Sequence, residues 1–502
     1  MQRNMINASS PQPGIPLFTT PETAVARHPG TILNPREQRA WIDSLPFGNP
    51  PHAAQLLLQQ LRLLVRDPEP GAKFGALLDS YQIPVWRLYE IASERDSGVT
   101  GNLVPLDQLE HALLELLTEM GLGYLRIANG LLLGGKAPAP ELLYRAGALL
   151  DNADHIERRH FGATSTRHWA SLLTIYQYAD GAGIVQTAIP ATHRQAGDPA
   201  DIAGLLFRAL MMGLCDPNHV APQHVVDWHT WIGGHTEHLE LGILPQGPFS
   251  IPVDVSGALS PLAGARRGKP GPSMRYLIAD SFLRALHDDP DAPEGLYETL
   301  GSLIKGRKLP EQRQSPRQER SHPFRLSVGL HDVHARLSAL TSGPNTAQTG
   351  TKTLPCVQKN QSKTGAAFYV TGTVATALSI GEVLLAETDN PRPGGAPVGF
   401  VGRIRRLVTD HAGQIEIGVE KLSGHLMPVT ISGAVAERAR GDCAALLQRH
   451  AGADKLVLIV PRSAYRENDT ATAEYAGGHY SLRMRRLIDD SPRIALIDVF
   501  ED

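Results

Sequence analysis

Two short motifs in the second half of this 502-residue chain combine residue types that suit nucleotide binding. Arg313 and Arg317 form the first motif, Arg-x-x-x-Arg. Asn360, Ser362 and Gly365 form the second, Asn-x-Ser-x-x-Gly. A guanidinium can clamp a phosphate, make paired hydrogen bonds to a guanine edge or stack on a purine. Asparagine and serine add short polar contacts, and a glycine lets a ligand approach the backbone. The two motifs are thus compatible with a ligand that carries phosphates and purine bases. The alternative is that the Arg-rich segment is a solvated linker and the second motif an ordinary hairpin turn.

The elements that must position these motifs lie on either side of a domain boundary. The arginines belong to the segment 306–323, which is almost free of apolar residues and is the clearest linker in the chain. After it the hydrophobic period changes to two, which predicts a small antiparallel β-barrel over 324–433 with a short helix inserted at 331–340. The expected strands are 324–329, 354–360, 366–371, 382–386, 398–407, 414–422 and 427–431.

The remaining parts of the chain have different patterns. Residues 1–50 are rich in proline and predict an extended or partly disordered arm. Residues 51–305 contain apolar residues at helical spacing, as in Ala54–Val65, and predict a helical domain, either a bundle or an array of helical pairs. Residues 434–502 predict a helix over 434–449 and then strands that either extend the barrel or form a small sheet beside it.

The expected fold class is therefore multidomain α+β. A mainly helical N-terminal region precedes a C-terminal antiparallel β-barrel with additional strands.

The stretch from about 313 to 432 resembles a PilZ domain, the bacterial receptor module for cyclic di-GMP. That family carries Arg-x-x-x-Arg just before the first barrel strand and Asp- or Asn-x-Ser-x-x-Gly on a later one. Residues 398–407 and 415–420 are also similar to the family's barrel hairpin. The gap between the two motifs is longer here than is usual in the family, which the helix inserted at 331–340 explains.

The resemblance implies that the chain binds cyclic di-GMP and requires no other cofactor. The implied ligand contacts are Arg313, Arg317, Arg320, Asn360, Ser362 and Gly365. The family spacing favours Arg313 and Arg317, with Arg320 third, but Arg320 and Arg325 lie closer to the first strand. Which of these arginines contact the ligand therefore stays open.

PilZ effectors typically control flagellar motility, type IV pili or exopolysaccharide. The resemblance thus implies a bacterial signalling effector of motility or biofilm formation, in which the helical domain contacts a protein partner. Residues 150–260 also loosely resemble the helical region upstream of the barrel in a group of atypical PilZ proteins. The alternative is a ligand-independent adaptor, because some PilZ-like domains bind no nucleotide.

Composition and motif content disfavour other functions. A net charge of −3 argues against a nucleic-acid polymer as partner, and no apolar run approaches the ~18 residues of a membrane span. Three widely spaced cysteines without metal spacing favour a reducing cytoplasm. We expect a cytoplasmic protein without membrane insertion. No nucleophile motif, phosphate loop or signature of cyclic di-GMP synthesis or breakdown is present, so we expect no enzyme.

A cluster of histidines is the remaining candidate for chemistry. Its members are His219, His224, His229, His235 and His238. His235 and His238 have a spacing that can present two imidazoles on one helix face, as in some metal sites. No carboxylate or cysteine completes a known metal pattern, however. We therefore expect partly exposed helix histidines and no bound metal.

Overall fold

The structure is a computed structural model of the chain. It describes residues 17–96, 102–103, 107–162, 165–256, 273–304, 318–319, 321–342, 352–371, 378–388, 399–410, 413–438, 443–450, 456–475, 478–491 and 493–501.

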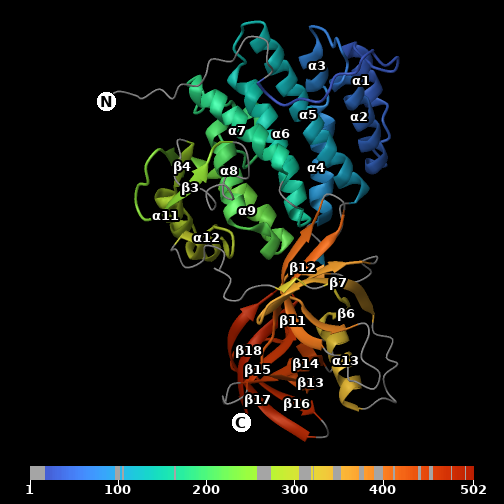
Figure 1. The fold of residues 1–502 in the computed structure, drawn as a ribbon, viewed down its shortest axis with the longest axis vertical. Helices are drawn as coiled ribbons and strands as arrows, with labels where there is room; N and C mark the ends of the chain where they lie inside the picture. The colour runs from blue at the N-terminus through green and yellow to red at the C-terminus, as the bar shows by residue number, and fades with distance from the viewer. Residues whose placement is uncertain are drawn as a thin grey trace. The chain divides into compact units, whose positions relative to one another are not determined.

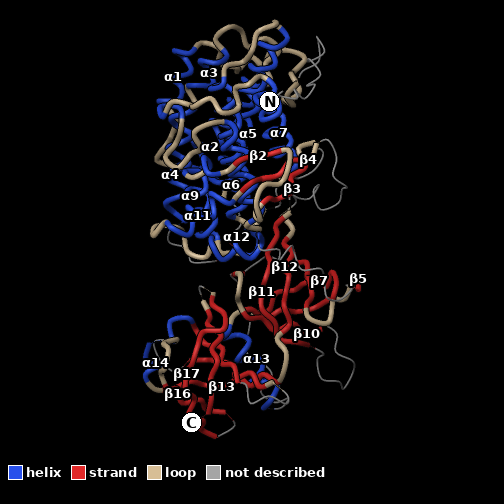
Figure 2. Tube along the Cα trace, turned by 90° about the vertical axis from the view of Figure 1, so that its left-hand side faces the viewer, coloured by secondary structure: helices blue, strands red, loops and turns tan. Residues whose placement is uncertain are grey.

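The chain forms two compact units. The first comprises residues 1–99, 105–217 and 222–310, and the second comprises residues 100–104, 218–221 and 311–502. The first unit is mainly helical, whereas strands dominate the second (Figures 1 and 2). A helical N-terminal region followed by antiparallel β-barrels confirms the predicted fold class.

The first unit is built around two long helices that lie side by side, α5 (Gln108–Leu133) and α6 (Pro140–Arg159) (Figure 1). Asp107 and Glu110 form a capping box that starts α5, and Pro140 occupies the first turn of α6. The two helices approach closely at Gly121, where an added Cβ would lie 3.0 Å from the Leu150 side chain. The absence of a side chain at Gly121 therefore allows α5 and α6 to pack closely.

The unit has further helices, most of which pack against that pair. They are α1 (Pro35–Asp43), α2 (Pro50–Val65), α3 (Phe74–Asp79), α4 (Gln82–Asp96), α7 (Thr166–Gly181), α8 (Ile202–Leu214), α9 (Pro222–Gly234), α11 (Asp280–Asp288) and α12 (Leu296–Ile304). Short 3-10 turns occur at η1 (Ala191–His193), η2 (Pro217–His219) and η3 (Thr236–His238). A small antiparallel sheet has the order β2 (Glu240–Gly242), β4 (Met274–Ile278) and β3 (Ser250–Asp254).

Helix α1 lies in the segment that we expected to be an arm. The Asn34 side chain caps it, Pro35 begins it, and Ile42 is buried, so a good N-cap and core packing outweigh the proline content of the segment. Among the described residues, no helix combines the length and apolar character that crossing a membrane requires.

The first barrel of the second unit contains the predicted site. Its sheet has the order β5 (Gln318–Glu319), β7 (Thr353–Gln361), β6 (Pro323–Val328), β10 (Val383–Thr388), β11 (Gly399–Thr409), β12 (Ile415–Lys421) and β8 (Gly365–Val370). Pairing between β7 and β8 closes the ring, and β5 pairs with β7 outside it. A short strand, β1 (Asn102–Leu103), pairs with β9 (Leu378–Ser379) in the same unit.

A second closed barrel follows, where we expected either more strands on the first barrel or a small sheet. Its strands are β13 (His425–Ser432), β14 (Cys443–Arg449), β15 (Leu456–Pro461), β18 (Ile494–Glu501), β17 (Gly478–Asp490) and β16 (Thr470–Tyr475), in that order around the ring. The strand expected at 427–431 in the first barrel is therefore β13 of the second.

The helix expected over 434–449 is also different in the structure. Helix α14 covers only Ala434–Arg438, and the rest of that segment contains strand β14. The sequence Cys443-Ala-Ala-Leu-Leu-Gln-Arg449 has helix-forming residues, but β14 pairs with β13 and β15 and is buried along most of its length. Tertiary pairing outweighs local propensity here.

The helix predicted at 331–340 is α13 (Leu330–Ser342), and it joins the two barrels. It packs against β6 and β10 of the first barrel and against β13 and β14 of the second. One apolar cluster of buried residues combines Val333 of α13 with Leu385 of the first barrel and Leu446 of the second. The two barrels therefore share part of their core.

Candidate functional site

The structure brings the end of the linker and the second predicted motif together on the first barrel. Gln318 pairs with Gln361, and Glu319 pairs with Asn360, in antiparallel register. Asn360 also pairs with Ala367 of β8. Asn360 is 8% exposed. Arg313, Arg317 and Arg320 lie outside the described residues, so their side chains are not placed.

Ser362 and Gly365 form the turn between β7 and β8. The Ser362 backbone N–H donates to the Gly365 carbonyl at 2.8 Å, and the Gly365 N–H donates to Ser362 Oγ at 3.1 Å. A Cβ added at Gly365 would lie 2.9 Å from the Val419 carbonyl oxygen, so this position requires glycine for close contact with β12. Ser362 and Gly365 thus have a structural role in the hairpin that does not depend on a ligand.

A pocket of about 280 Å³ opens beside this hairpin. Its lining residues come from five strands and the residue before β6, and they are His322, Phe324, Gln358, Gln361, Thr388, Gly399, Phe400 and Lys421. Lys421 Nζ donates to the Ser362 carbonyl at 3.2 Å and lies 4.8 Å from the centre of the Phe400 ring. The pocket therefore has an ammonium group and an aromatic face next to the turn.

Buried side chains hold the walls of this pocket. The Phe368 ring contacts both Phe324 and Phe400, at centroid separations of 5.4 Å and 6.2 Å. Gln358 is 1% exposed, and its amide donates to Gln361 Oε1 at 3.2 Å, beside a register shift in the pairing of β7 with β8. The local backbone irregularity thus directs polar side chains toward the pocket.

The charges around the hairpin are partly compensated. Lys359 Nζ lies 2.7 Å from Glu416 Oε2 and 4.8 Å from the centre of the Tyr369 ring. Hydrogen bonding to Glu416 raises the pKa of Lys359. Lys363 and Arg325 are exposed. Lys421 and Phe400 were not predicted as site residues, because only the strand register brings them beside Ser362.

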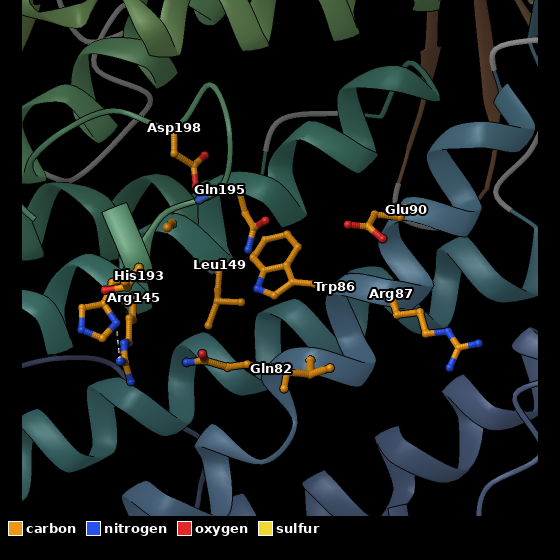
Figure 3. Close-up of a pocket in the computed structure, with 12 residues that line it drawn as sticks. Gln82, Trp86, Arg87, Glu90, Arg145, Leu149, His193, Gln195 and Asp198 are labelled. Atoms are coloured by element: carbon orange, nitrogen blue, oxygen red, sulfur yellow. Dashed lines mark hydrogen bonds between the residues drawn. The ribbon is translucent and has the colours of Figure 1, made fainter. Parts of the chain in front are cut away.

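The first unit has a larger pocket, of about 400 Å³ (Figure 3). Its walls include Gln82, Ile83, Trp86, Arg87, Glu90, Arg145, Ala148, Leu149, Thr192, His193, Gln195 and Asp198. Arg145 donates to Asp79 Oδ1 at 2.9 Å and to His193 Nδ1 at 2.8 Å. The Trp86 indole points into the middle of the pocket (Figure 3). Aromatic, cationic and amide groups therefore converge there, a set that suits a polar aromatic ligand.

A buried network of charged residues lies behind that pocket. Arg208 is 1% exposed, and it donates to Asp151 Oδ2 at 2.7 Å and to Asp198 Oδ1 at 3.0 Å. His229 lies 3.3 Å from the same Asp151 oxygen, and its ring stacks on His155 at 4.0 Å. Burial and the Arg208 charge hold the pKa of His229 well below its ordinary value, so its ring is neutral.

His229 therefore differs from the expected set of partly exposed histidines. His235 and His238 are partly exposed, as predicted. The sequence signal for the buried network is Arg208 itself, because an arginine inside the apolar helix Ile202–Leu214 requires buried acidic partners.

The fold defines a multidomain α+β protein in which a helical region with a polar pocket precedes paired antiparallel β-barrels. Residues 36–246 match a family model described as "Cyclic-di-GMP receptor FimW, N-terminal domain". This part of the chain is thus similar to the N-terminal domain of a cyclic di-GMP receptor. The match covers less than half of the chain. It includes neither the Arg-x-x-x-Arg motif of the linker nor the Asn-x-Ser-x-x-Gly motif of the first barrel. No curated protein matches the chain.

Proposed function

We propose that the protein is a cyclic di-GMP receptor whose ligand binds on the first barrel. The observation that carries this proposal is the pairing of β5 with the end of β7, because it joins the end of the linker to the second motif. The similarity of residues 36–246 to a receptor's N-terminal domain supports the same ligand independently, since the two barrel motifs lie outside that match.

The proposed contacts follow from the chemistry of the ligand. Arg317 is bonded to Gln318, whose backbone pairs with Gln361, so a guanidinium of the linker can reach a ligand held at the hairpin. Arg313 and Arg317 would clamp phosphates or guanine edges, with Arg320 as a third candidate. Asn360 and Lys421 would add polar contacts, and the Phe400 ring offers a face for a base.

The proposed output is a signalling response in the bacterial cytoplasm. In the PilZ-like interpretation, ligand binding orders the linker arginines against the barrel and changes how the helical unit contacts a protein partner. That partner would belong to the machinery of motility, type IV pili or exopolysaccharide. The pocket around Trp86 and Arg145 is a candidate contact surface in the helical unit.

Calorimetric titration of cyclic di-GMP into the full chain tests the ligand. The wild type should bind saturably, and Arg317→Ala should weaken binding by at least tenfold, about 1.4 kcal/mol, because a charge-assisted contact is lost. Arg483→Ala is the matched control, since Arg483 is an exposed arginine on the second barrel. Equal affinity in the two variants would contradict the proposed role of Arg317.

A ligand-independent adaptor is the second candidate function. The hydrogen bonds between Ser362 and Gly365 favour it, because they explain the second motif by hairpin structure alone. Absence of binding heat from wild-type protein that unfolds cooperatively would support this candidate and reject the receptor.

A further inference from the structure

Three side chains at the junction of α6 and α7 direct acceptor atoms toward one another. Asp154 and Glu157 are one turn apart on α6, and His168 lies in the first turn of α7, after the Ser165 cap. One carboxylate oxygen from each acid and one histidine ring nitrogen all lie within 4.8 Å of one another. His168 Nδ1 is 3.8 Å from Glu157 Oε2.

These atoms are buried, and none has a hydrogen-bond partner among the described residues. Asp154 is 5% exposed and His168 is 4% exposed. The atoms without partners are Asp154 Oδ1, Glu157 Oε2 and His168 Nδ1. A buried polar atom without a partner is unfavourable, so three at one place indicate that a binding partner belongs there.

The hydrogen bond of Thr118 fixes which histidine nitrogen has the free lone pair. The Thr118 hydroxyl donates to the Leu114 carbonyl at 2.8 Å, and its oxygen lies 3.3 Å from His168 Nε2. Because that hydroxyl hydrogen is already used, Nε2–H must donate to Thr118. Nδ1 is then an unprotonated acceptor that faces Glu157.

The surrounding charges are consistent with a cation as the missing partner. The Asp154 and Glu157 carboxylates lie close together in this buried place, so a cation bound between them would relieve their mutual repulsion. Arg158 forms an ion pair with the other Asp154 oxygen and balances one negative charge. Glu115, which is partly exposed, lowers the potential at both Glu157 and His168.

We propose that Asp154, Glu157 and His168 bind a divalent transition-metal ion, which links α6 to α7. One imidazole with two carboxylates suits Zn²⁺, Mn²⁺ or Fe²⁺ better than Mg²⁺ or Ca²⁺, which prefer oxygen ligands only. Ligand atoms about 2.1 Å from a tetrahedral metal lie about 3.4 Å apart. The 3.8 Å separation between His168 and Glu157 needs only a small closure.

Cobalt titration of chelator-treated full-length protein tests this site. Bound Co²⁺ should give d–d absorption bands at one equivalent, and Zn²⁺ should raise the Tm of the wild type. Glu157→Gln should abolish both effects, because its amide N–H can donate to His168 Nδ1 and occupy the metal's place. Thr118→Val should weaken binding by about 10–100-fold, as loss of an orienting partner does at other metal sites.

Glu237→Gln is the matched control. Glu237 and His238 form a pair on the surface with the same 3.8 Å separation. If added metal binds only to surface carboxylates and histidines, Glu237→Gln should reduce binding and Glu157→Gln should not. Without metal, Glu157→Gln should have a Tm at least equal to that of the wild type. Absence of Co²⁺ bands in the wild type, or equal binding by Glu157→Gln and Glu237→Gln, would reject the site.

Discussion

Arg208 places a positive charge inside the buried network around Asp151. Its guanidinium is fully buried between Asp151 and Asp198, and it disfavours a second positive charge nearby. Burial, together with the Arg208 charge, holds the pKa of the neighbouring His229 well below its ordinary value, so its ring is neutral in the folded protein.

His229 should make the stability of the protein depend on pH. In the unfolded chain it ionises with a pKa of about 6.5, so below that pH the unfolded state takes up a proton that the folded state does not. Stability is then lost as pH falls through 6.5, by up to about 1.4 kcal/mol per pH unit for this group. Urea unfolding at pH 7, 6 and 5 should show a smaller loss in His229→Gln than in the wild type.

The control for this comparison is His28→Gln, which changes an exposed histidine in the same unit. Its pH dependence should match that of the wild type. Parallel curves for His229→Gln and the wild type would show that His229 is not the titrating group.

The site residues that the sequence could predict are those that form a local motif. Asn360, Ser362 and Gly365 form one motif and lie together at one hairpin, which the sequence indicates directly. Lys421 and Phe400 join that site only through the register of β12 and β11, so no local pattern reveals them. The roles proposed for Arg313, Arg317 and Arg320 remain predictions.

At the level of elements, helix α13 connects the cores of the two barrels. It supplies Val333 to an apolar cluster that also contains Leu385 and Leu446, one from each barrel. The inserted helix that separates the two sequence motifs therefore stabilises the unit that carries them.

Leu446→Ala should destabilise both barrels together. Leu446 is fully buried, so truncation should lower the unfolding free energy of the second unit by about 2–5 kcal/mol. Unfolding should stay a single transition, because the barrels share this cluster. Leu340→Ala on α13 is the control, since that side chain is 42% exposed and should change stability by less than about 0.5 kcal/mol. Separate transitions for the two barrels in Leu446→Ala would contradict a shared core.

Elements with local signals were easier to predict than those that depend on distant partners. The amphipathic helices and the strands of the first barrel follow from periodicity and turn residues. Closure of the second barrel requires β13 to pair with β16, far along the chain, and the segment of β16 was not predicted as a strand. Strand β14 has helix-forming residues, and only its two neighbouring strands determine its conformation.

At the scale of the whole molecule, the similarity to a receptor and the barrel motifs fall on different units. Residues 36–246 carry the family match, and the first barrel carries the hairpin motif. The helical unit has its own polar pocket around Trp86, so the proposed barrel site must be tested against this second location.

Trp86→Ala distinguishes the two locations. If the barrel binds the ligand, Trp86→Ala should retain wild-type affinity for cyclic di-GMP while Arg317→Ala loses it. Loss of affinity in Trp86→Ala alone, with an unchanged Tm, would assign the receptor site to the helical unit. Calorimetry and thermal unfolding of both variants provide the comparison.

The pairing of β1 with β9 has a practical consequence for dissecting the protein. Residues 100–104, between two helices of the first unit, belong to the second, as do residues 218–221. A fragment that starts at residue 311 would leave the buried strand Leu378–Ser379 without its neighbour. A single cut therefore cannot yield two complete units, and genetic truncation should be replaced by point substitutions or by a circular rearrangement that keeps β1.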